Sequence, residues 1–107
     1  MAWHDLKWSA AEKKIARQAY DSALESALAK LMAEFKRKAN AATAVSEVWE
    51  IEDYLREQRR DLDRVFDYRY SQLPMVFAYL LRKGLLDESR LSGLSDDKLE
   101  IIRAMRF

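Results

Sequence analysis

Cysteine is absent from the 107-residue chain, and only two glycines and one proline occur. Without cysteine the chain can form neither a disulfide nor a thiolate metal site, which fits a reducing compartment such as the cytosol. Glycine and proline are the residues of tight turns, so their scarcity argues against a many-stranded sheet. The sequence therefore predicts an all-α fold.

A long apolar run is also missing. The longest, residues 73–81, is too short to cross a bilayer, and residues 1–5 show no basic region followed by an apolar stretch. The 19 basic and 18 acidic residues leave a formal charge of +1, so no global attraction to nucleic acid or anionic membrane is expected. We expect a cytoplasmic protein with no integral membrane segment and no signal peptide.

Groups that carry catalysis are equally scarce. His4 is the single histidine, and the chain has no glycine-rich phosphate loop and no nucleophile motif. A di-metal helical bundle uses inward-facing Glu-x-x-His pairs, and none occurs. We therefore expect no enzyme, no metal and no cofactor, and instead a protein that binds another protein.

Hydrophobic residues make up 50% of the chain and charged residues 35%, which is typical of a folded protein. We expect a single domain built from an N-terminal arm (1–8), a helical stem (9–70) and a helical head (71–107). In the stem, the capping box Ser9–Glu12 starts a helix that runs to about Ala39. After a short break at 40–43, Thr43 caps a second helix that extends to about Tyr68.

In the head, proline in a first turn and glycine just past an end bound one helix between Pro74 and Gly84. Two short helices follow, one around Asp87–Leu91 and one capped by Ser95.

Both stem helices carry apolar residues at heptad-like spacing. Two long helices joined by a short break pack as an antiparallel hairpin, but such a hairpin cannot cover both seams by itself. Two-fold dimers are the commonest assemblies, so we expect a homodimer that pairs through the stem. The expected interface residues are Leu24, Leu28, Leu31, Phe35, Ile51, Leu55 and Leu62.

The second helix also carries a polar stretch around a tryptophan, in which Asp53, Arg56 and Arg60 are spaced to form a charge ladder. Such ladders are usually solvated faces, and a helix tryptophan is often core. Tryptophan beside arginine is, however, typical of protein-binding hot spots, so both interpretations of Trp49 stay open. Basic runs at 36–38 and 59–60 leave nucleic-acid binding as a weaker alternative.

Several stretches of the sequence are specific in combination: Trp8-Ser9, Val48–Leu55, Arg59–Asp63, Phe66–Arg69, Val76–Leu85 and Leu94–Leu99. Together they resemble the fluorescence recovery protein family of cyanobacteria. The resemblance covers nearly the whole chain. It implies a homodimer of long stem helices with helical heads, which binds the C-terminal domain of the photoactivated orange carotenoid protein. It also implies faster return of that protein to its inactive orange form and its detachment from the phycobilisome antenna, near the thylakoid.

The resemblance implies that Trp49, Asp53, Arg59 and Trp8 contact the partner. To these we add neighbouring charges and one head residue as candidate contacts: Glu52, Arg56 and Met75. Glu52 stands where the family typically has histidine, and Met75 replaces a head aromatic. Pro74 and Arg64 stand where related sequences have an aliphatic residue and glycine. These departures keep open an alternative, a homologous helical dimer that binds a different protein.

Overall fold

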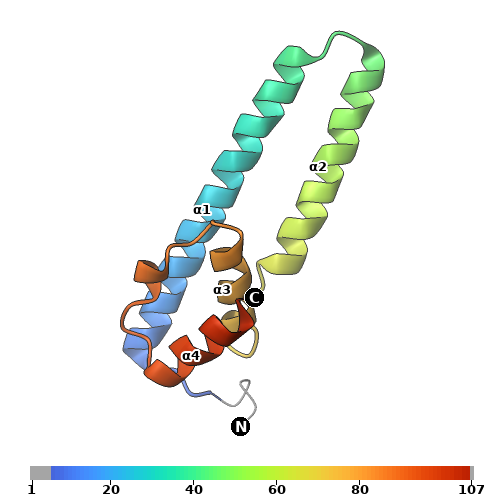
Figure 1. The fold of residues 1–107 in the computed structure, drawn as a ribbon. Coiled ribbons are helices and arrows are strands. Elements are labelled where there is room, and N and C mark those ends of the chain that lie inside the picture. Colours follow the sequence, from blue (N-terminus) through green and yellow to red (C-terminus); the bar gives the residue numbers. More distant parts are fainter. Residues whose placement is uncertain (1–5, 107) are drawn as a thin grey trace.

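The computed structural model describes residues 6–106, which fold into helices joined by short connections (Figure 1). An isolated bridge between Ser92 and Leu94 is the sole β pairing within this range. Of the expected N-terminal arm, residues 1–5, with Trp3 and His4, lie outside the described part. The elements are α1 (Ala10–Ala41), α2 (Val45–Val65), α3 (Leu73–Arg82), the 3₁₀ helix η2 (Glu88–Leu91) and α4 (Asp96–Met105).

The molecule is elongated, with extents of 54 × 23 × 23 Å. Helices α1 and α2 run antiparallel as a hairpin, and their connection lies at the end farthest from α3 and α4 (Figure 1). The head, made of α3, η2 and α4, packs on the amino-terminal half of α1. The predicted all-α fold with a helical hairpin and a C-terminal helical head is confirmed.

Local signals set the two helix starts of the stem. The Ser9 N–H donates to Glu12 Oε1 and the Glu12 N–H donates to Ser9 Oγ, both at 3.1 Å, so the predicted capping box is confirmed. The assignment of Thr43 as cap of α2 is wrong, because Ala44 occupies that position. Glu47 reaches back instead and accepts hydrogen bonds from the backbone N–H groups of both Thr43 and Ala44 at 3.2 Å.

Helix α2 ends at Val65, three residues before the predicted end at Tyr68. Phe66 leaves the helical conformation at φ −83° and ψ 79°. Its ring and that of Tyr68 then pack edge-on against Tyr20 of α1, with centroids 5.3 and 4.8 Å away. These aromatic contacts stabilise the non-helical conformation of residues 66–68. In a continued helix, side chains two residues apart would point in different directions, so both rings could not pack on Tyr20.

The predicted boundaries in the head are confirmed. Pro74 lies in the first turn of α3, and Gly84, with φ +73°, follows its end. Asp87 caps η2 by accepting from the Ser89 N–H at 2.9 Å. Ser95 is the residue before α4, although its hydroxyl binds Lys98 rather than a backbone N–H.

One hydrophobic core joins the head to α1. From α1 it takes a stripe of small side chains that lets the head approach closely: Ala16, Ala19 and Ala23, each fully buried. From the head it takes Leu73, Phe77, Leu80, Leu91 and Ile102. Gly93 lies close to α1, because a Cβ there would lie 2.6 Å from Ile15 Cδ1. By contrast, no side chain of α2 is buried.

No helix within residues 6–106 is long and apolar enough to cross a membrane.

Candidate protein-binding surface

The connection end of the hairpin exposes large apolar side chains on the first turns of α2. Val45 is 67% exposed, Val48 50% and Trp49 59%. Their spacing of three and four residues places them side by side along the helix. An exposed tryptophan on a helix is typical of a protein-binding hot spot, since burying its ring against a partner removes a large apolar area from water. Of the two interpretations of Trp49, the structure excludes core within this chain.

Charged side chains continue along α2 from this apolar tip. Arg56 donates to Glu52 at 2.6 Å, and both side chains are more than half exposed. Asp53 and Arg59 are exposed and form no ion pair with another described residue. The predicted Asp53–Arg56–Arg60 ladder is therefore wrong, because Arg56 turns to Glu52. An exposed pair of this kind adds little stability and leaves both groups accessible to a partner.

The other two predicted contacts lie at the opposite end of the molecule, in the head. Met75 is 47% exposed on α3. Trp8 is half-buried against the core, its ring 5.6 Å from that of Tyr70 and 5.1 Å from the ammonium of Lys98. The structure thus brings five of the seven predicted contacts together on α2, and separates Trp8 and Met75 from them. Contact of any of these residues with a partner stays a prediction.

The expected dimer seam divides into two groups. Leu28 is 47% exposed, and Leu24, Phe35, Ile51 and Leu55 are half-buried along the hairpin. Met32, one turn after Leu28, is 53% exposed and was missed, although its i+4 spacing could have revealed it. Leu31 and Leu62 instead line a cleft inside the hairpin.

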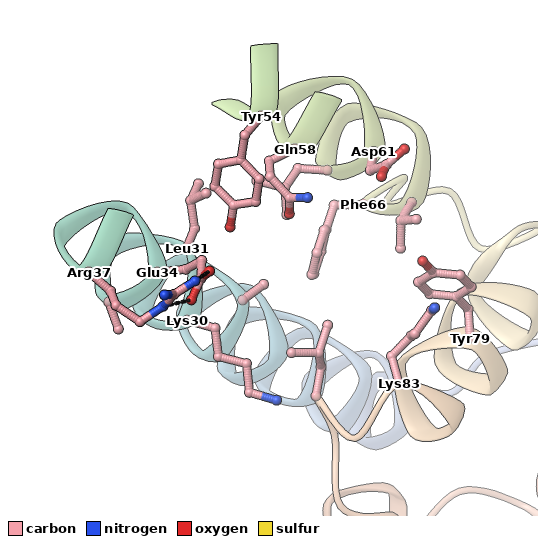
Figure 2. Close-up of a pocket in the computed structure, with 15 residues that line it drawn as sticks. Lys30, Leu31, Glu34, Arg37, Tyr54, Gln58, Asp61, Phe66, Tyr79 and Lys83 are labelled. Atoms are coloured by element: carbon pink, nitrogen blue, oxygen red, sulfur yellow. Dashed lines mark hydrogen bonds and ion pairs between the residues drawn. The ribbon is translucent and has the colours of Figure 1, made fainter. Parts of the chain in front are cut away.

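This cleft, about 680 Å³ in volume, lies between α1, α2 and the end of α3 (Figure 2). Aromatic side chains of Tyr54, Phe66 and Tyr79 contribute to its walls. An ion pair joins Arg37 and Glu34 at its rim, where the Arg37 Nε donates at 3.0 Å. That hydrogen bond lowers the pKa of Glu34, and burial raises the pKa of Tyr54. Within residues 6–106, no group of three or more His, Asp or Glu side chains is placed to hold a metal ion.

A family model described as photoprotection regulator fluorescence recovery protein matches residues 8–106. The chain belongs to this family. The fluorescence recovery protein of Synechocystis sp. is 33% identical over 98 residues, covering 92% of this chain and 90% of the relative. The solved structure of that Synechocystis protein superimposes with a TM-score of 0.89 at 32% identity, and the Fremyella diplosiphon fluorescence recovery protein with 0.89 at 31%. Each comparison covers 92% of this chain and 97% of the solved chain.

The fluorescence recovery protein match spans the hairpin and the head alike, and it begins at Trp8. The chain is therefore a member of a family of photoprotection regulators along essentially its described length. The family match and the similarity of fold confirm the resemblance that was drawn from stretches along nearly the whole sequence.

Proposed function

We propose that this protein binds the photoactivated orange carotenoid protein through its C-terminal domain. It thereby speeds the return of that protein to its inactive orange form and detaches it from the phycobilisome, so that antenna quenching ends. The observation that carries the proposal is the exposed Trp49 with its apolar neighbours at the hairpin tip, in a chain of the fluorescence recovery protein family.

The proposed action needs no catalytic group. A regulator that binds one conformational state more tightly than another shifts the equilibrium between them, and one that also stabilises the transition state speeds relaxation. Trp49 supplies apolar contact area, while Asp53 and Arg59, exposed on the same helix, supply charges that select a complementary surface. We infer a non-enzymatic regulator that acts in the cytoplasm, near the thylakoid-associated antenna.

We also propose that two copies pair through the hairpin. Leu28 and Met32 of α1 are about half exposed, and α2 buries no side chain within its own chain. Apolar area of this kind on a long helix pair is stabilised when a second hairpin covers it, giving a four-helix stem. A two-fold dimer is the simplest such arrangement.

The function is tested by adding the purified protein to photoconverted orange carotenoid protein and timing its dark return to the orange form. We expect acceleration at substoichiometric amounts. Trp49→Ala should lose most of this acceleration, whereas Glu57→Ala, an exposed change on the same helix, should keep it. No acceleration by a folded protein would contradict the proposal and favour a homologous regulator of another protein.

The dimer is tested by light scattering at micromolar concentration. Leu28→Glu should shift the mass from two chains to one, because it places a charge on an apolar contact. Ala29→Glu, also exposed on α1 but turned away from Leu28, is the matched control and should leave the mass at two chains. A single-chain mass for the unmodified protein would refute the pairing.

A further inference from the structure

The head contains one buried charged side chain that the proposed partner surface does not use. Lys98 of α4 is 4% exposed, although lysine is rarely buried without a partner. Its ammonium is surrounded by oxygens. It donates to the Lys7 carbonyl at 2.6 Å and to Ser95 Oγ at 3.3 Å, and it pairs with Glu12 Oε2 at 3.1 Å.

Glu12 connects two segments that are far apart in sequence, the start of α1 and the start of α4. Its carboxylate accepts from the Ser9 N–H at 3.1 Å, where α1 begins, and from the Ser95 N–H at 2.9 Å, where α4 begins. It also holds the Lys98 ammonium. Two helix amino termini and one cation therefore share a single carboxylate, whose side chain is 12% exposed. The two helix amino termini and the Lys98 ammonium each stabilise the negative charge of the Glu12 carboxylate.

The Trp8 ring also contacts the same ammonium. The Lys98 Nζ is 5.1 Å from the centre of the Trp8 ring, within the range of a cation–π contact. Because Lys98 also binds the Lys7 carbonyl, it holds both the backbone before Trp8 and the ring itself. Tyr70 packs on the ring from the connection between α2 and α3.

We propose that the ion pair of Glu12 and Lys98 acts as a latch. It couples the packing of α4 on α1 to the packing of the Trp8 ring against the head. With the ion pair closed, the Trp8 ring is covered and α4 is seated. When the pair is broken, residues 7–9 and the first turn of α4 loosen together, and Trp8 becomes accessible. The latch stands on the geometry of this chain and does not depend on the identity of the binding partner.

The test uses Trp8 as a reporter. Substituting Trp3→Phe and Trp49→Phe leaves Trp8 as the one tryptophan of the chain. In this background, Lys98→Met and Glu12→Gln should each raise acrylamide quenching of Trp8 by about twofold or more, because local opening exposes the ring. Lys83→Met is the matched control, since Lys83 lies over the Tyr79 ring at 5.6 Å but is exposed. It should leave the quenching unchanged.

Hydrogen exchange supplies the second readout. In both latch variants the amides of residues 7–9 and 95–98 should exchange faster together, while those of α2 keep their rates. Circular dichroism establishes that each variant is helical, and if Lys98→Met unfolds, Glu12→Gln decides. Unchanged Trp8 quenching in a folded latch variant would overturn the proposal. Faster exchange in α4 with unchanged exchange at residues 7–9 would overturn it equally, because the two segments would then move independently.

Discussion

Glu12 should make the stability of this protein depend on pH in acid solution, between the pKa of an unfolded glutamate and the lower pKa that Glu12 has in the folded state. Burial by itself would raise the pKa of Glu12. Hydrogen bonds from the Ser9 and Ser95 backbone and the pairing with Lys98 outweigh that effect, and the pKa falls from 4.5 to about 2. The folded state therefore holds the proton more weakly than the unfolded chain does.

The sign and the size follow from linkage. A carboxyl whose folded pKa is depressed contributes stability above its unfolded pKa, and the contribution disappears as pH falls through the folded pKa. A difference of this size corresponds to about 3 kcal/mol in the free energy of unfolding. We expect the Glu12 contribution to be nearly complete above about pH 5, small near pH 2 and absent below it.

The assay is urea unfolding of the wild-type protein and of Glu12→Gln at several pH values between 2 and 7. Glutamine has nearly the shape of protonated Glu12, so the two curves should differ most at neutral pH and converge near pH 2. Other carboxylates with lowered pKa values, such as Asp67 and Asp87, contribute equally to both proteins and cancel in the difference. Glu25→Gln, an exposed change on α1, is the control and should overlay the wild-type curve. A difference between wild type and Glu12→Gln that is independent of pH would refute the role of the carboxylate charge.

Two further predictions concern the core between the head and α1. Gly93→Ala should destabilise the protein by about 2 kcal/mol, chiefly because φ +104° strains an alanine and to a smaller extent because the end of the Ile15 side chain must move away from the new methyl, whereas Gly84→Ala, with φ +73° and nothing within 4 Å, should cost about 1 kcal/mol. Chemical denaturation of the two variants compares them, and equal losses would contradict the greater strain expected at Gly93. Phe77→Ala should cost about 3–5 kcal/mol because the ring is fully buried, and a loss below 1 kcal/mol in the same assay would show that the site repacks.

Where signals are local, the sequence predicts this fold well. The Ser9–Glu12 capping box, Pro74 in the first turn of α3 and Gly84 after its end each act within a few residues, and each is found where expected. The end of α2 depends instead on Tyr20, which is far away in the sequence. Its ring packs on Phe66 and Tyr68 in their non-helical conformation. The sequence of α2 by itself therefore does not predict that the helix ends at Val65.

The candidate site likewise combines features that the sequence predicts with contacts that only the fold creates. Trp49 is exposed on a helix, as one of the two interpretations of its sequence context required. The contacts that Trp8 and Lys98 make within the chain could not be predicted from sequence, because they come from segments more than 60 residues apart that only the fold brings together. An aspartate or glutamate three residues after a serine predicts a capping box, but it does not predict that the same carboxylate will also serve a second helix.

The head packs on one face of helix α1, and the proposed pairing of two chains uses another face of the same helix. The head packs on the alanine stripe around Ala19 and Ala23, while Leu28 and Met32 lie about 100° or more around the helix axis and outside the core cluster. Leu28→Glu should therefore yield a monomer whose head remains folded, with unchanged near-ultraviolet circular dichroism, a signal to which the buried Tyr20 and Phe77 of this core contribute. If the head melts when the chains separate, the two faces are energetically coupled, and the pairing stabilises the head core as well as the stem.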